Sequence, residues 1–255
     1  MLTQPTLDRL RELRLRGMAD AFAAQTESPE AAGLSFEERL GLLVDAEWTH
    51  RRNTMLARLL REARLRLPAC PEDVEFRAAR GLDRATWRSL FAGDFVQHHQ
   101  NVLIVGPTGV GKTYLACALG HAVCRLGMRV RYLRLGQLLG DIALARLDGS
   151  YGVLFARLCR ADLLLLDDFG LAPLSGSEAR ELLEVIDDRY ERRSTVVCSQ
   201  LPLGEWHRAI SDPTLADAIL DRLVHGAHKF TLAGESMRKK KGGATAKETE
   251  GEATL

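Results

Sequence analysis

Lysine is nearly absent from the first 228 residues of this 255-residue sequence. Lys112 is the only lysine before Lys229, and arginine supplies the other positive charge of that stretch. No run of eighteen apolar residues occurs, so we expect no membrane span, and the polar, helix-patterned N-terminus is not that of a signal peptide. The five cysteines form no C-x-x-C pair, and we interpret them as small core residues in a reducing cytoplasm.

The one early lysine lies in a glycine-rich segment that fits G-x-x-x-x-G-K-[ST]. The segment reads Gly106-Pro107-Thr108-Gly109-Val110-Gly111-Lys112-Thr113. In such a loop the backbone N–H groups surround nucleotide phosphates, and the threonine hydroxyl holds magnesium. A buried-strand pattern (101–105) precedes it and a helix pattern (114–119) follows, which places the phosphates at a helix N-terminus. The sequence therefore predicts binding of a nucleoside triphosphate with Mg²⁺.

Two adjacent carboxylates complete the predicted nucleotide site. Residues 163–166 are an unbroken run of leucine, which is typical of a strand buried on both faces, and Asp167 and Asp168 follow directly. We predict that Asp167 holds magnesium and that Asp168 polarises the attacking water as a general base. The pair indicates a hydrolytic site.

The regular alternation of strand and helix patterns after residue 100 predicts an α/β fold with a parallel sheet flanked by helices. Strands are expected at 101–105, 130–135, 163–166, 195–199 and 229–232, and helices at 137–146, 151–160, 177–191 and 214–225. The first hundred residues show only helix periodicity. We expect one helix carrying Leu7 through Met18, one starting at a capping box on Ser35, a third over 51–66, and a linker with Gly81 and Gly93.

The third of these helices is rich in arginine. Residues 51–66 contain six arginines and one acid, Glu62. A basic amphipathic helix can lie against phosphates, against an acidic partner or in water. The candidate DNA contacts on it are Arg51, Arg52, Arg58 and Arg61. Such contacts would be salt-dependent and indifferent to base sequence, and no helix-turn-helix or zinc-finger spacing indicates base readout.

The order of phosphate loop, Asp-Asp strand, polar strand end and late arginines resembles that of AAA+ ATPases. In that family a polar residue ending the next strand senses the γ-phosphate, and Gln200, with Ser199 beside it, matches that position. A late arginine enters the neighbouring subunit's site, and Arg222 matches it. A second arginine contacts the γ-phosphate, and Arg238 matches that one. The resemblance implies an ATPase that acts as a homo-oligomeric ring or spiral.

The likeness narrows to the IstB helper ATPases of insertion sequences, over about residues 7–241. It is carried by residues 10–18, 35–40, 80–83, 199–207, 212–223 and 234–239. The resemblance implies ATP-dependent binding and remodelling of double-stranded DNA that assists a partner transposase in choosing a target. We expect a helical DNA- or partner-binding domain over 1–95, an AAA+ ATPase domain over 96–238 and, from composition, a disordered tail over 239–255. By analogy Arg146, in the extra helical stretch 136–151, is a further candidate DNA contact.

Two departures from the wider AAA+ pattern carry expectations of their own. Asp168 stands where most members have glutamate, which predicts slow turnover. Few residues follow Leu232, so no full C-terminal lid is expected. A helicase loader of the DnaC kind is the nearest alternative, and a P-loop small-molecule kinase and a nucleotide-stabilised scaffold without hydrolysis are others.

Overall fold

The structure, a computed structural model, describes residues 3–76, 81–234 and 237. The chain divides into two compact units, Met1–Arg58 and Leu59–Leu255, and each is described by itself. The division falls inside one helix, α3 (Phe36–Ala63), rather than at residue 95, where the sequence placed a domain boundary. Residues 59–95 belong to the second unit because α4 (Arg84–Ala92) packs against its helix α6 (Lys112–Arg125).

The first unit begins with two short helices, α1 (Thr3–Glu12) and α2 (Arg16–Glu27), where the sequence predicted one. The single-helix prediction was wrong because Arg14 adopts a left-handed backbone with φ 60°. The Arg14 N–H then bonds to the Arg11 carbonyl and the Leu15 N–H to the Leu10 carbonyl, which ends α1. The short helix η1 (Glu30–Gly33) follows α2.

Helix α3 merges the second and third predicted helices into one of 28 residues. Its start is the predicted capping box, in which the Ser35 N–H donates to Glu38 and the Glu38 N–H donates to the Ser35 hydroxyl. No proline or helix-ending glycine separates the two predicted segments, so nothing interrupts the backbone hydrogen bonds. Gly17 lets α2 approach α3 closely, since a Cβ there would lie 2.6 Å from the Ala46 carbonyl oxygen.

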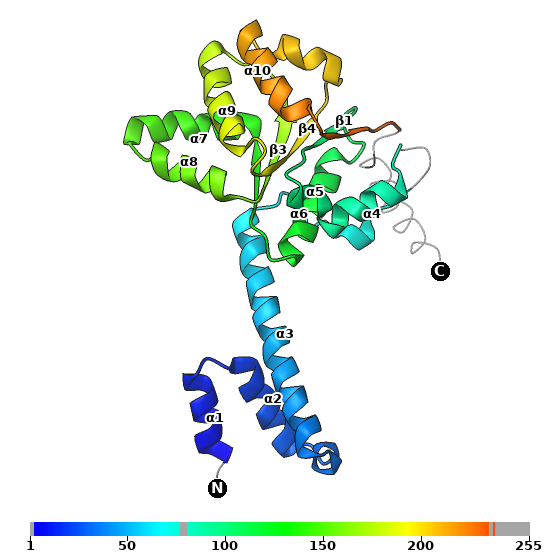
Figure 1. Cartoon of the computed structure of the whole chain (residues 1–255), viewed down its shortest axis with the longest axis vertical. Helices are drawn as coiled ribbons and strands as arrows, with labels where there is room; N and C mark the ends of the chain where they lie inside the picture. The colour runs from blue at the N-terminus through cyan, green and yellow to red at the C-terminus, as the bar shows by residue number, and fades with distance from the viewer. Residues whose placement is uncertain (1–2, 77–80, 235–236, 238–255) are drawn as a thin grey trace, which may run out of the picture. The chain divides into compact units, whose positions relative to one another are not determined.

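The second unit is built on a parallel sheet of five strands in the order β2-β3-β4-β1-β5 (Figure 1). The strands are β1 (Val102–Val105), β2 (Val130–Arg134), β3 (Leu163–Phe169), β4 (Ser194–Ser199) and β5 (His228–Thr231). All five predicted strands are confirmed, with bounds within one residue except at the carboxyl end of β3. The predicted α/β class is therefore confirmed.

Helices cover both faces of this sheet. Alternate strand residues, among them Leu164, Leu166 and Val197, pack in one core cluster with α7 (Leu135–Asp148), α9 (Gly176–Arg189) and α10 (Pro213–Val224). Helix α6 packs against the strands through Gly120, where a Cβ would lie 2.9 Å from a methyl carbon of Leu165. Helix α8 (Tyr151–Arg160) packs beside α7 and α9.

The prediction of a linker between Gly81 and the first strand was wrong, because helices α4 and α5 (Asp94–Gln97) occupy most of this stretch. Asp83 caps α4 by accepting a hydrogen bond from the Thr86 N–H. Trp87, on α4 itself, is fully buried. The remaining short helices are η2 (Pro71–Asp73) and η4 (Leu203–Ala209).

All five cysteines are free, and three of them are buried. Burial raises the pKa of the Cys124 thiol to about 12, in keeping with a core role. Among the described residues, no helix is long and apolar enough to cross a membrane.

Candidate functional site

The glycine-rich loop joins the carboxyl end of β1 to the start of α6. Gly106 has φ 148°, and a Cβ there would lie 2.4 Å from the Leu232 carbonyl oxygen, so only glycine fits beside the chain that leaves β5. Gly111 has φ 97° and is the N-cap of α6. The first helical N–H groups of α6 thus point toward the loop, where an anion is favoured.

Lys112 is the first residue of α6 and its side chain is largely buried. Its ammonium donates to the carbonyl oxygens of Gly106, at 2.6 Å, and of Pro107, at 2.9 Å. These bonds fold the side chain across the loop whose N–H groups would surround phosphates.

Thr113 and Asp167 form a pair of oxygen ligands suited to Mg²⁺. The Thr113 hydroxyl donates to Asp167 Oδ2 at 2.8 Å, and the Tyr132 hydroxyl donates to the same oxygen at 2.8 Å. Burial, followed by this bond to Asp167, raises the pKa of Tyr132. Magnesium is commonly held in proteins by one carboxylate, a hydroxyl and substrate phosphates, and this pair fits that pattern. The described residues contain no cluster of three or more His, Cys, Asp or Glu side chains that would hold a metal by itself.

A β-bulge in β3 sets the position of the two carboxylates. Between Leu166 and Phe169, β3 has one residue more than the facing stretch of β4, and Asp168 has φ 61°. Asp167 is buried, whereas the Asp168 side chain is 27% exposed. The predicted roles of metal ligand and water-polarising base therefore correspond to two distinct positions.

Two arginines that the sequence reasoning missed lie beside these carboxylates. Arg66 lies 3.8 Å from Asp167 Oδ2 and 4.0 Å from Asp168 Oδ2, and Arg134 lies 3.8 Å from Asp168 Oδ2. The register pairs Arg134 with Asp167, so its place at the end of β2 was the available signal. Arg66 follows α3 by three residues, and no sequence pattern connects it with β3.

Gln200 lies beside the glycine-rich loop, as predicted for a phosphate-sensing residue: the Thr108 hydroxyl donates to Gln200 Oε1 at 2.7 Å. Ser199 is fully buried. Its hydroxyl donates to the Phe169 carbonyl at 2.7 Å and accepts from the Leu201 N–H at 3.0 Å. The Ser199 side chain holds β4 to β3, which leaves Gln200 as the residue of the pair positioned for a nucleotide.

Arg222 lies near the start of β1, far along that strand from the glycine-rich loop. Its carbonyl accepts from the Asn101 amide at 3.0 Å, and its guanidinium donates to Asp187 Oδ1 at 2.6 Å. The loop begins beyond the other end of β1, about 13 Å away at the usual rise per strand residue. Arg222 is thus not placed to reach the chain's own nucleotide site.

The predicted DNA contacts fall into two groups. Arg51 pairs with the buried Glu47 at 2.6 Å, and Arg52 lies over the Trp48 ring at 5.0 Å from its centre. Arg58 and Arg61 are exposed on α3. Arg146 makes a bidentate pair with Glu181 at 3.0 and 2.8 Å and stacks on Tyr151, so its guanidinium is engaged by side chains of its own chain.

Arg238, the tail from residue 239 and the segment that would build a lid lie outside the described residues. Met237, the last one described, donates its N–H to the Gly109 carbonyl at 2.9 Å. Met237 therefore lies against the glycine-rich loop.

This sheet, with the glycine-rich loop after β1 and paired carboxylates at the end of β3, is that of a P-loop AAA+ protein. The solved structures agree. DnaA bound to AMPPCP and single-stranded DNA superposes with a TM-score of 0.55 over 72% of this chain and 56% of that chain, at 20% identity. DnaI superposes with a TM-score of 0.55 over 66% of this chain and 90% of its own, at 18% identity. At such identities the likeness concerns the fold.

Sequence comparison identifies the family. The family described as IstB-like ATP binding protein matches residues 8–244, and the chain belongs to it. The insertion-sequence ATP-binding protein y4pL of Sinorhizobium fredii is 51% identical over 94% of this chain and 98% of its own length. The ATP-binding protein of insertion sequence IS21 from Pseudomonas aeruginosa is 32% identical over 95% of this chain and 92% of its own.

Proposed function

We propose that this protein is a cytoplasmic ATPase that binds double-stranded DNA under the control of ATP and assists the transposase of its insertion sequence in choosing target DNA. One observation carries the proposal: Lys112 and Thr113 of α6, Asp167 and Asp168 of β3, and Gln200 directly after β4 meet around one loop at the carboxyl edge of the sheet. Membership of a family named for ATP binding, with relatives encoded in insertion sequences, supports it.

In this proposal each side chain has a defined task. Lys112 and the N–H groups of the loop hold the phosphates, and Thr113 and Asp167 hold Mg²⁺, which offsets phosphate charge. Asp168 orients and polarises the attacking water. Gln200, at the end of β4, contacts the γ-phosphate. Release of the γ-phosphate after hydrolysis is therefore transmitted to β4. The described contacts of Asp168 with Arg66 and Arg134 compete with its role as a base, and hydrolysis is accordingly slow.

DNA stimulates this hydrolysis through the segment that follows α3. Arg131 NH1 donates to the Glu62 carbonyl at 3.1 Å, so the end of α3, from which this segment starts, lies beside the edge strand β2. Four residues later Arg66 approaches both carboxylates. A ligand that displaces this segment therefore changes the charge beside Asp167 and Asp168.

Oligomerisation completes the site. Arg222 lies away from its own chain's loop, and we infer that it enters the site of a neighbouring copy, where it stabilises charge in the transition state. ATP then favours the assembled state, and each added copy brings further cations to the DNA. Hydrolysis loosens the interface and releases DNA.

Binding to a labelled random-sequence duplex, measured with ATP, with ADP and without nucleotide, tests the proposal. Lys112→Ala removes the ammonium from the loop. Lys229→Ala, which removes the same side chain from an exposed position on β5, is the matched control. We expect tight binding only with ATP, lost in Lys112→Ala and kept in Lys229→Ala. Equal binding in all nucleotide states would contradict ATP control, and no duplex binding would contradict the function.

The helicase-loader alternative shares the fold but not the sequence likeness, since DnaI is only 18% identical. Co-purification of the tagged protein with the transposase of its element or with a hexameric helicase separates the two. Retention of the helicase alone would favour the alternative.

A further inference from the structure

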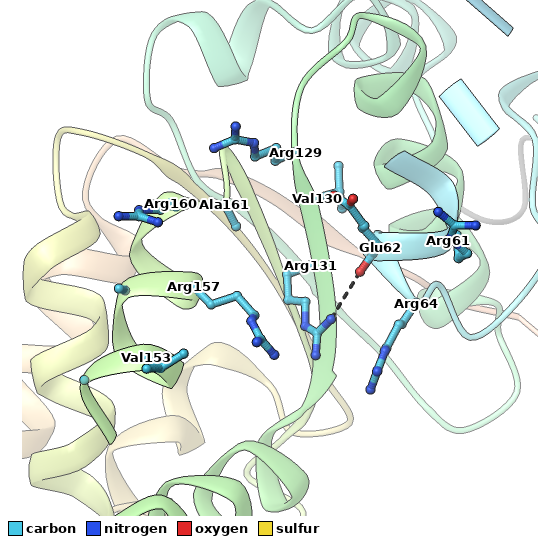
Figure 2. A pocket seen from close by; sticks show the side chains of 12 residues that line it. Arg61, Glu62, Arg64, Arg129, Val130, Arg131, Val153, Arg157, Arg160 and Ala161 are labelled. Carbon is cyan, nitrogen blue, oxygen red and sulfur yellow. Dashed lines mark hydrogen bonds between the residues drawn. The ribbon is translucent and has the colours of Figure 1, made fainter. Parts of the chain in front are cut away.

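A cleft lined by arginine lies in the Leu59–Leu255 unit, away from the glycine-rich loop. It offers about 780 Å³ between the end of α3, the start of β2 and helix α8 (Figure 2). The loop and its carboxylates lie at the carboxyl ends of the strands, whereas Arg129, Val130 and Arg131 are at the amino end of β2. This cleft therefore plays no part in the nucleotide site.

Arginine dominates the lining of this cleft, with one acid, Glu62, among its twelve residues. The arginines are Arg61, Arg64, Arg129, Arg131, Arg157 and Arg160. Within the described part of the chain, none of these six guanidinium groups forms a salt bridge. Asp162, the acid nearest in sequence to Arg160, is 3.6 Å from Arg193 instead. The positive charge of the cleft is therefore not neutralised by side-chain ion pairs.

Three of the guanidinium groups share one part of the cleft. In Figure 2 the side chains of Arg64, Arg131 and Arg157 extend into the same region from three different elements. Burial lowers the pKa of Arg131, and the nearby charges of Arg64 and Arg157 lower it further, with Asp141 opposing them. Like charges held this close repel one another, and an anion between them would relieve the repulsion.

The backbone of Arg64 adds a second, independent observation. This residue follows the last residue of α3 and has φ 53°, a left-handed conformation in which glycine or asparagine is favoured. An arginine at this place costs conformational energy that glycine would avoid. Its side chain lies in the cleft, which gives a reason for arginine at this position.

The rest of the lining indicates which anion fits. Gly152, Val153 and Ala156 line the α8 side of the cleft, and among the residues that the structure describes no aromatic ring lines it. Grooves for single-stranded DNA combine cations with aromatic rings on which bases stack, and those rings are missing here. Arginine forks match phosphate oxygens in pairs.

We propose that this cleft binds the phosphate backbone of double-stranded DNA without reading its bases. The proposal rests on the function proposed above and names a DNA-contacting surface for it that extends from Arg61 at the end of α3 across β2 to α8.

The test uses the full chain with ATP and a labelled random-sequence duplex, titrated at several salt concentrations. The double variant Arg64→Gly with Arg157→Ala removes two guanidinium groups, and glycine at position 64 suits the backbone, so the fold is retained. The matched control, Arg88→Ala with Arg192→Ala, removes two exposed arginines outside the cleft. A labelled polyglutamate and a single strand of the same length are the comparison ligands.

We expect the double variant to bind the duplex at least about tenfold more weakly, with a slope of log affinity against log salt reduced by about 2, and the control to match the wild type. Unchanged duplex affinity and slope in the double variant would overturn this inference while leaving the proposed function in place. Loss of polyglutamate binding alone would assign the cleft to an acidic protein, and stronger binding of the single strand would overturn the duplex assignment. Failure of the wild type to bind any DNA would refute the proposed function itself.

Discussion

Substituting Gly106 by alanine tests whether the chain leaving β5 fixes the shape of the glycine-rich loop. The new Cβ would lie 2.4 Å from the Leu232 carbonyl oxygen, which is backbone and cannot rotate aside. The φ of 148° adds a strain of about 1–3 kcal/mol for a residue with a Cβ, and the steric overlap adds about 1–3 kcal/mol more. We therefore expect Gly106→Ala to lose about 2–6 kcal/mol of unfolding free energy.

The same substitution has a second, functional consequence. Any relaxation moves the loop away from Leu232 and misaligns the N–H groups that would hold phosphates. We expect ATP affinity to fall at least about tenfold, which corresponds to about 1.4 kcal/mol of binding free energy. Urea unfolding and titration with a fluorescent ATP analogue measure the two effects separately.

Gly140→Ala is the matched control for this prediction. Gly140 lies inside α7, its added Cβ would meet no atom within 4 Å apart from its chain neighbours and the nearby backbone of its own helix, and alanine there should stabilise the protein by about 0.5–1 kcal/mol. Its ATP affinity should equal that of the wild type. If Gly106→Ala unfolds within about 0.5 kcal/mol of the wild type and binds ATP equally well, the proposed restraint by Leu232 is wrong.

Three further predictions concern other parts of the second unit. Arg222→Ala should leave ATP binding intact and abolish hydrolysis in a phosphate-release assay. Turnover of the variant at the wild-type rate would exclude a role of Arg222 in the neighbouring copy's site. Arg66→Met removes a positive charge 3.8 Å from Asp167 Oδ2 that would compete with Mg²⁺ for this carboxylate. The Mg²⁺ concentration needed for half-maximal nucleotide binding should therefore fall about fivefold, which corresponds to about 1 kcal/mol. An unchanged Mg²⁺ requirement would argue against competition between Arg66 and Mg²⁺. Burial, then Arg125, lower the pKa of His121, so the unfolded chain takes up the proton first and stability should fall as pH drops below about 6.5. Urea midpoints at pH 7.5 and 5.5 should differ less in His121→Gln, and an equal difference would contradict this assignment.

Local patterns sufficed for much of the fold. The apolar run before Asp167 predicted β3 because a strand covered on both faces needs apolar residues throughout. The capping box at Ser35 predicted the start of α3 because its two hydrogen bonds join residues three apart. Where one residue's backbone decided the outcome, as at Arg14, the periodicity of leucine gave no warning of the break between α1 and α2.

By itself, the sequence determined the glycine-rich loop, the carboxylate pair and the order of strands and helices after residue 100, since each depends on neighbours along the chain. Only the tertiary structure decided that Arg66 and Arg134 lie beside those carboxylates and that Arg146 is held by Glu181. It also gathered six arginines from α3, β2 and α8 around one cleft. The physical reason is that charges interact through space, and folding brings together residues that no spacing along the chain connects.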